Sequence, residues 1–251
     1  MPRRNYEQQQ IPDEDRAFVR SLVIHDDAAV LAFDKPSGLP VQTRNPDDRT
    51  LDSLMAAFAK SNGKRPRLVH RLDAQTSGVI LAARTQPAAA ALSAAFAGRE
   101  VAKTYLALVA GPDFESAEGE IDTALARYRQ KPELELMRAA RPGDDAQSAL
   151  TRWRVLASAG ATHLLELAPQ TGRMHQLRVH LSIVGRPILG DPYYGGQTTL
   201  RGELIPRLML HAWKLDLPHP SGERLKLKAR APKDFLAVAS VAGLDLALTT
   251  D

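Results

Sequence analysis

The sequence of 251 residues contains no cysteine. Without thiols the chain cannot form disulfides, zinc–thiolate sites or a cysteine nucleophile, which fits a reducing compartment. Aromatic residues are also scarce, at 5%, so few rings are available to stack on nucleic-acid bases. No apolar run approaches the roughly 18 residues of a membrane-spanning helix, and segment 1–10 lacks the apolar core of a secretory signal. We therefore expect a soluble, cytoplasmic protein.

Sequence motifs of nucleotide sites, metal sites and serine nucleophiles are missing as well. The sequence contains no Walker loop, no G-x-G-x-x-G, no H-E-x-x-H and no G-x-S-x-G nucleophile turn. His175 and His180 lie five residues apart, a spacing that does not complete a recognised metal motif. We expect neither a cofactor nor a metal ion.

The charge balance is compatible with a polyanionic partner but does not require one. The net charge is +4 and the pI is about 9.4, with 25% charged and 44% hydrophobic residues. This composition is ordinary for a globular protein, and the length is sufficient for one large domain or two small ones.

The order of predicted elements favours an α+β fold with a mixed, largely antiparallel sheet, flanking helices and a central cleft. Strands are expected in hairpins more often than in regular alternation with helices. We expect one domain over 21–242, a poorly ordered polar leader over 1–20 and a tail over 243–251. The charged segment 113–146 predicts only weak strands. The other predicted strands and helices span residues 21–35 (two strands), 50–58 (helix), 77–83, 86–97 (helix), 103–110, 149–157, 162–168, 173–184 (helix), 209–217, 224–230 and a helix after Pro232.

One carboxylate stands at the start of a predicted buried strand. Asp73 follows the basic pair His70 and Arg71 and precedes a Thr-Ser-Gly turn that begins at Thr76. An aspartate is ionised at neutral pH and can act as a nucleophile or base, and neighbouring cations suit chemistry on a polyanion. The alternative is an aspartate that only caps its turn, which is common.

A second block of cations falls on the predicted helix over 173–184. His175, Arg178 and Leu181 recur at three-residue spacing and would share one helical face. Cations on an inward face need an anionic partner, whereas a solvated basic face is the alternative. Tyr105 lies on the predicted strand over 103–110, where it is either a core residue or part of a site.

These segments resemble the motifs of the RluA-type RNA pseudouridine synthases, in the order found in that family and over about residues 28 to 230. The resemblance implies the pseudouridine synthase fold and the isomerisation of specific uridines in ribosomal or transfer RNA, with base flipping and without a cofactor. The matching segments are K-P-x-G-x-x-V at 35–41, H-R-L-D-x-x-T-S-G at 70–78, K-x-Y at 103–105, T-G-R-x-H-Q-x-R-V-H-L at 171–181 and G-x-P-I-x-G-D-x-x-Y-G at 185–195.

The resemblance also implies residue roles. Asp73 is expected to be the catalytic residue, Arg178 its ionic partner and Tyr105 a ring that stacks on the uracil. Met174 stands where the family usually has Thr or Ser, and Asp191 is expected to be a structural anchor. The residues expected to bind substrate are His70, Arg71, Thr76, Arg173, His175 and Gln176.

Several alternatives stay open. Asp73 could attack the sugar, add to the base or remove a ribose proton. A catalytically silent RNA-binding protein of the same fold, or a carboxylate-dependent glycosidase, which normally needs two acids, are the competing functions. We expect a monomer that binds RNA without an obligate protein partner; the leader is too short for a separate RNA-binding module.

Overall fold

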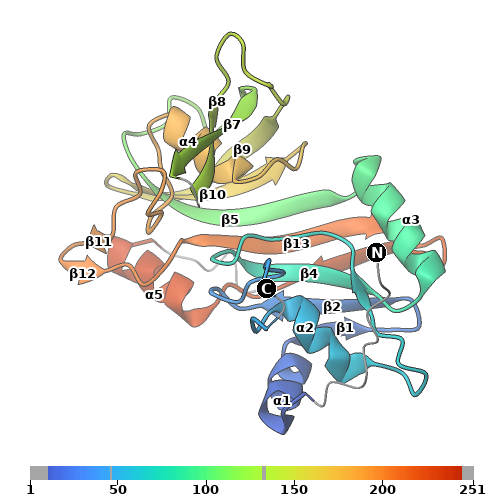
Figure 1. The fold of residues 1–251 in the computed structure, drawn as a ribbon. Coiled ribbons are helices and arrows are strands. Elements are labelled where there is room, and N and C mark those ends of the chain that lie inside the picture. The colour runs from blue at the N-terminus through green and yellow to red at the C-terminus, as the bar shows by residue number, and fades with distance from the viewer. Residues whose placement is uncertain (1–10, 46, 132–133, 245–251) are drawn as a thin grey trace. The chain divides into compact units, whose positions relative to one another are not determined.

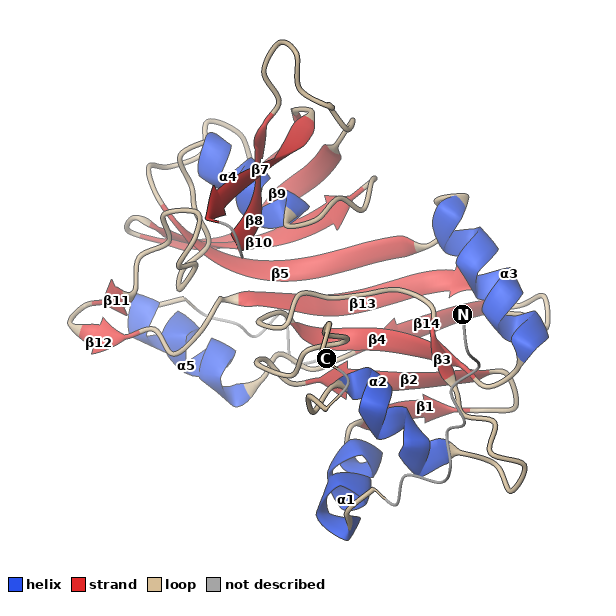
Figure 2. Ribbon diagram, in the orientation of Figure 1, coloured by secondary structure: helices blue, strands red, loops and turns tan. Residues whose placement is uncertain are grey.

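The computed structural model describes residues 11–45, 47–131 and 134–244. It confirms an α+β fold with a largely antiparallel sheet (Figures 1 and 2). The chain divides into two compact units, one formed by residues 1–101 and 216–229 and the other by 102–215 and 230–251. Strand β13 (Leu210–Pro218) runs through the boundary at residue 215. No helix in the described ranges is long and apolar enough to cross a membrane.

The first unit is built on strands β1, β2 and β4, which pair in that order and are antiparallel. Strand β3 pairs with the end of β4, and β14 pairs with β13. Its elements are α1 (Asp13–Ser21), β1 (Val23–Asp26), β2 (Val30–Lys35), α2 (Leu51–Leu54), the 3-10 helix η1 (Met55–Phe58), β3 (Arg67–Leu68), β4 (Ser77–Ala83), α3 (Gln86–Ala97) and β14 (Arg224–Lys228).

The core of this unit lies between one face of β2 and β4 and the helical segment α2–η1. Phe33 and Ile80 alternate with residues that face the other way, and they pack against Met55. The Thr50 hydroxyl accepts a hydrogen bond from the Ser53 amide and the Ser53 hydroxyl accepts one from the Thr50 amide, so a capping box fixes where α2 begins. Every residue of β4 is buried, as its uninterrupted apolar run predicts.

The expected poorly ordered leader over 1–20 is wrong for its second half. Residues 13–21 form helix α1, with Val19 fully buried in the core, while residues 1–10 lie outside the described part of the chain. The missed signal is Pro12 followed by three acidic residues, because acids in the first turn interact favourably with the helix dipole. The predicted tail over 243–251 is described only to Leu244.

The second unit carries strands β13, β5, β10, β9 and β6 in that order, with antiparallel pairing of β5 with β10, β10 with β9 and β9 with β6. Two further hairpins, β7–β8 and β11–β12, stand outside this sheet. Its remaining elements are β5 (Ala102–Ala110), β6 (Glu118–Asp122), β7 (Leu125–Lys131), β8 (Leu134–Ala139), β9 (Leu150–Ala159), β10 (Thr162–Pro169), α4 (Gln176–Ile183), β11 (Thr199–Leu200), β12 (Glu203–Leu204) and α5 (Lys233–Ala242).

Segment 113–146 is more regular than expected, since it contains the three strands β6, β7 and β8. Only a few apolar side chains on these strands are buried, among them Ile121, Leu125, Leu136 and Met137. Many of the other positions are charged or exposed, which obscures the alternation that reveals a strand in sequence.

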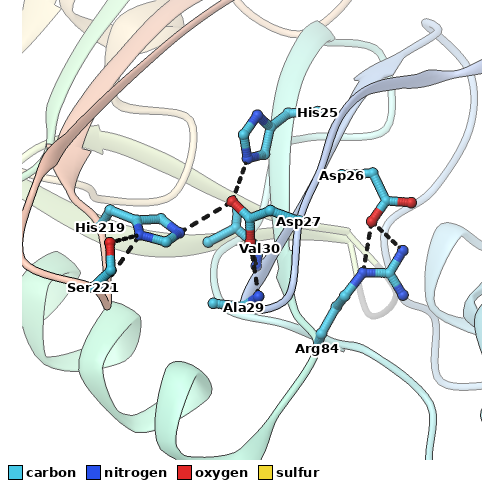
Figure 3. A network of polar contacts seen from close by, with 8 residues as sticks. All are labelled: His25, Asp26, Asp27, Ala29, Val30, Arg84, His219 and Ser221. Carbon is cyan, nitrogen blue, oxygen red and sulfur yellow. Dashed lines mark hydrogen bonds and ion pairs between the residues drawn. The ribbon is translucent and has the colours of Figure 1, made fainter.

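A polar network on the first unit connects the turn between β1 and β2 with the turn after β13 (Figure 3). Asp27 Oδ2 lies 2.6 Å from His25 Nε2 and 3.2 Å from His219 Nε2, and Asp27 Oδ1 accepts hydrogen bonds from the amides of Ala29 and Val30. Burial opposes ionisation of this carboxyl, but these hydrogen bonds and the nearby His219 prevail and lower the pKa of Asp27 to about 2. The carboxylate therefore holds both turns throughout the neutral range.

Asp34 is a half-buried carboxyl on β2 whose environment acts in the opposite direction. Burial raises the pKa of Asp34 from 3.8 to about 6. Because the pKa is higher in the folded state than in the unfolded chain, the contribution of Asp34 to stability is complete below about pH 4. That contribution is lost as the pH rises through about 6.

We therefore predict that Asp34→Asn stabilises the protein at pH 7.5 and has little effect at pH 4. The difference between the two pKa values corresponds to at most about 3 kcal/mol, which solvent screening reduces to an expected gain of about 1 to 2 kcal/mol. Urea unfolding at the two pH values measures it, with the exposed Asp145→Asn as control. An equal effect of Asp34→Asn at both pH values would contradict the prediction.

Candidate active site

The predicted catalytic carboxylate lies on a tight turn that leads into β4. The carbonyl oxygen of Asp73 accepts a hydrogen bond from the Thr76 amide at 3.1 Å, and the strand begins at the next residue. Asp73 is half-buried and Arg71 is exposed, whereas Thr76 has only 2% of its surface accessible. The turn thus places Asp73 at the mouth of a buried strand, as the sequence predicts.

A fully buried lysine supports this turn. Lys35 Nζ donates to the carbonyl oxygens of Ala74 and Leu39, both at 2.9 Å, and of Pro36 at 3.0 Å. The amide of Gly38 donates to the same Ala74 carbonyl at 2.9 Å. A buried ammonium requires several acceptors to offset its lost hydration. The K-P-x-G segment therefore fixes the backbone directly after Asp73.

His70 holds the segment that precedes the turn. Its Nε2 accepts a hydrogen bond from the Leu81 amide at 2.9 Å, so that nitrogen carries no proton. The ring also stacks on Phe96, with centroids 4.5 Å apart and planes 24° from parallel. In these contacts His70 anchors the chain to β4 and α3.

In the second unit, Tyr105 lies half-buried on β5, opposite Leu167 of β10. Lys103 lies two residues earlier, and therefore on the same face of the strand. Its Nζ donates to the Thr171 carbonyl oxygen at 3.1 Å. The Tyr105 face of β5 is thereby connected to the loop that precedes α4.

That loop is organised by Gln176, which is 4% exposed. Its Oε1 accepts from the Thr171 hydroxyl at 2.7 Å and the Arg173 amide at 3.0 Å. Its Nε2 donates to the Leu150 carbonyl and to the Thr151 hydroxyl oxygen, each at 3.0 Å. The amide expected to bind substrate is thus engaged by four protein groups and serves as a brace. Arg173 Nε donates to a carbonyl oxygen, that of Ser148, at 3.0 Å.

The helix predicted over 173–184 begins three residues later, at Gln176. His175 has a left-handed backbone, with φ at 53°, so it does not share a helical face with Arg178 and Leu181 as expected. The side-chain bonds of Gln176 hold the preceding residues in a loop, and this effect is not visible in the hydrophobic period.

His180 is a buried structural histidine. Its Nε2 donates to the Thr123 carbonyl oxygen and its Nδ1 accepts from the Thr151 hydroxyl, both at 3.0 Å. Burial lowers the pKa of His180, so the ring stays neutral. Among the described residues no group of three or more His, Asp or Glu side chains is placed to hold a metal ion.

Arg178 is held by a buried carboxylate. Its Nε and Nη2 donate to the two oxygens of Asp191 at 2.7 and 2.8 Å, and both residues are less than 5% exposed. Asp191 also accepts the amides of Tyr193 and Tyr194. The rings of these tyrosines lie 5.6 and 5.0 Å from the guanidinium carbon. Asp191 is therefore the structural anchor that the sequence suggests, and it fixes the plane of the guanidinium.

The loop that carries Asp191 depends on two glycines. A Cβ on Gly190, where φ is 73°, would lie 1.9 Å from the carbonyl oxygen of Arg207. A Cβ on Gly196 would lie 2.0 Å from the carbonyl oxygen of Ile188. Only glycine fits at either position, which explains the G-D-x-x-Y-G pattern together with its neighbouring glycine.

Tyr194 is the site residue for which sequence reasoning gave no role. Its hydroxyl lies 2.8 Å from His175 Nδ1 and accepts the Met137 amide at 3.0 Å. The available signal was its fixed place three residues after Asp191, but its partners on β8 and before α4 are remote in sequence.

Comparison with known proteins identifies the family. The family model described as RNA pseudouridylate synthase matches residues 29–183, which include Asp73, Tyr105 and Arg178. An uncharacterized RNA pseudouridine synthase of Zymomonas mobilis is 36% identical over 85% of this chain and 94% of its own length. Ribosomal large subunit pseudouridine synthase D of Xanthomonas campestris is 38% identical over 87% of this chain and 68% of its own length.

A further relative and a solved structure indicate the same family. The tRNA pseudouridine synthase C of Pectobacterium carotovorum is 38% identical over 83% of this chain, which spans 58% of that relative. The solved structure of human RNA pseudouridylate synthase domain containing 4 has a TM-score of 0.78 and 27% identity, and the match covers 93% of this chain and 98% of that one. These findings confirm the resemblance to the RluA type, and the chain belongs to the RNA pseudouridylate synthase family, whose members isomerise uridine in RNA to pseudouridine.

Proposed function

We propose that this protein isomerises specific uridines of ribosomal or transfer RNA and that Asp73 is its catalytic residue. The observation that carries the proposal is the Asp73 turn, in which a buried lysine and a glycine amide converge on the carbonyl that follows Asp73. Such a scaffold holds a carboxylate in place before substrate binds, which lowers the cost of reaching the transition state.

The proposed reaction conserves all atoms of the substrate. The bond between ribose C1′ and uracil N1 breaks, the uracil turns, and C1′ bonds to C5. The proton of C5 is removed and N1 gains one, so no oxidant or co-substrate is needed. Asp73 would act as nucleophile at the sugar or the base, or as the base that removes a proton.

Arg178 and Tyr105 have separate proposed roles. The motif resemblance supports Arg178 as the ionic partner of Asp73, and the two bonds to Asp191 hold its guanidinium in one orientation. Tyr105 would stack on the uracil once it has been flipped out of the RNA, which costs a few kcal/mol.

The residues expected to bind substrate fall into two groups. Arg71 is exposed, which suits contact with a phosphate or with the gap left by the flipped base. Thr76 and Gln176 are nearly inaccessible to solvent. His70 accepts a hydrogen bond from a backbone amide, and Arg173 donates one to a backbone carbonyl oxygen. We assign positioning roles to these four residues, and that of His175 is considered below.

The substrate class rests on the relatives. One is named for the large ribosomal subunit and another for tRNA, at the same 38% identity, so both RNAs stay within the proposal. A protein that binds RNA without modifying it is the competing function, and the next experiment separates the two.

We predict that Asp73→Asn lowers pseudouridine formation by about a thousandfold or more, the scale expected for removal of an essential catalytic side chain. RNA affinity should stay within about threefold, because the substitution is isosteric. Total RNA from cells that lack the protein is treated with each purified variant, and carbodiimide labelling and sequencing map the product. A wild-type protein that binds RNA and forms no pseudouridine would favour the silent RNA-binding function.

We also predict that Lys35→Met destabilises the protein by about 2 to 4 kcal/mol, because the carbonyl oxygens of Pro36 and Leu39 lose the ammonium as donor and that of Ala74 keeps only the Gly38 amide. Methionine has a similar length, so packing changes little. Urea unfolding measures the loss, with the exposed Lys64→Met as matched control. A loss below about 1 kcal/mol would show that the ammonium does not hold the turn.

A further inference from the structure

The hydroxyl of Tyr194 joins two segments that are distant in sequence. It accepts the amide of Met137 on β8 at 3.0 Å and lies 2.8 Å from Nδ1 of His175, immediately before α4. Tyr194 is 9% exposed and its ring meets the His175 ring nearly edge-on, at 77° and 5.7 Å. The hydroxyl therefore bonds one buried and one half-buried partner, and the connection is not a surface contact.

Elementary chemistry limits the direction of these bonds. Burial raises the pKa of Tyr194 to about 12, so the phenol keeps its proton at neutral pH. The Met137 amide can only donate, so the phenol oxygen accepts that bond. The phenol proton and a second lone pair are both left for His175, so the phenol donates to an unprotonated Nδ1 or accepts from a protonated one, according to the tautomer of the ring.

The backbone of His175 shows what this bond maintains. A left-handed conformation costs a residue other than glycine about 1 kcal/mol, and His175 adopts it with φ at 53°. Glycine would fit this backbone without that cost. The side chain of His175 therefore makes interactions that offset the strain, and its bond to Tyr194 is one that glycine could not make.

Tyr194 also touches the arginine of the candidate site. Its ring centroid lies 5.0 Å from the guanidinium carbon of Arg178, and its amide donates to Asp191, the carboxylate that orients Arg178. One side chain thus contacts the β7–β8 hairpin, the start of α4 and Arg178.

The hairpin is suited to respond to RNA. Arg129 and Lys131 are exposed on β7, where they can contact phosphates. Helix α4 lies against β8 (Figure 1). A shift of the hairpin on binding would therefore reach α4 through β8 and the Tyr194 hydroxyl.

We propose that Tyr194 is a positioning residue for the pseudouridine synthase reaction, whose hydroxyl couples the β7–β8 hairpin to His175 and whose ring orients Arg178. This inference rests on the proposed function, since it concerns the same reaction. It assigns Tyr194 an effect on the rate of the bound complex and none on RNA affinity.

The test is Tyr194→Phe, which keeps the ring over Arg178 and removes both hydrogen bonds. The expected result is a single-turnover rate about tenfold lower at saturating RNA, with the half-saturating RNA concentration changed less than twofold. Tyr128→Phe on β7 is the matched control, because the hydroxyl of this half-buried tyrosine makes no hydrogen bond to another described residue. Equal rates for wild type and Tyr194→Phe would overturn the proposal.

A readout independent of activity accompanies the kinetics. Nitrogen-15 NMR of the imidazoles should show a hydrogen-bonded Nδ1 of His175 in the free wild-type protein and a shifted Nδ1 signal in Tyr194→Phe, where that bond is lost. Hydrogen exchange of the Met137 amide should accelerate at least tenfold in the variant. An unchanged Nδ1 signal would overturn the coupling even if the rate fell.

His175→Gly keeps the test decisive if Tyr194→Phe folds poorly. Glycine relieves the backbone strain but removes the bond to Tyr194, so the two effects on stability oppose each other; the variant should fold and still lose about tenfold in rate. A folded His175→Gly protein with full activity would contradict the proposal. An inactive wild type with the expected His175 Nδ1 signal would instead show that the proposed function is wrong, and the positioning role would fall with it.

Discussion

The buried ion pair of Arg178 and Asp191 is the constraint on which the candidate site depends. Removing either partner would leave an uncompensated charge in the interior, which costs several kcal/mol, so the pair fixes every segment attached to it. Those segments are the first turn of α4 and the 188–196 loop. The loop meets the constraint only because Gly190 and Gly196 permit backbone approaches that no side chain would allow. Asp191 is thus required for the orientation of the arginine rather than for chemistry.

The first unit also contains a buried cation, but the hydrogen-bond acceptors described for it are of a different kind. Lys35 is a buried cation that donates to three neutral carbonyl oxygens. These neutral acceptors bring no anion of their own to the turn of Asp73. In both units a buried cation orders loops that have no regular structure of their own. Reactive groups placed on loops held in this way can be precise without lying on a helix or strand.

The elements whose local sequence pattern is strong are the ones that can be predicted from the sequence. Strand β4 has an uninterrupted apolar run, and α3 has a capping threonine, an early proline and a final glycine, so both were located to within a residue. The predictions failed where contacts between residues distant in sequence determine the local structure. The start of α4 is set by bonds of Gln176 to residues 25 and 26 positions away. Because these partners occupy its amide, Gln176 acts as a brace and not as the substrate ligand that was expected. The polar strands β6 to β8 bury too few side chains to show a period. Tyr194 had no visible role because its partners lie 19 and 57 residues earlier in the chain.

The most direct test of this account is a double-mutant cycle on single-turnover rates, with Arg178→Lys, Asp191→Asn and the two combined. If Asp191 acts only by orienting the guanidinium, Asp191→Asn should lower the rate by about tenfold or more beside Arg178. In the Arg178→Lys background, Asp191→Asn should have little further effect, because lysine cannot donate the two parallel hydrogen bonds that arginine gives to Asp191. Losses that simply multiply in the double variant would contradict the claim that the buried pair organises the site.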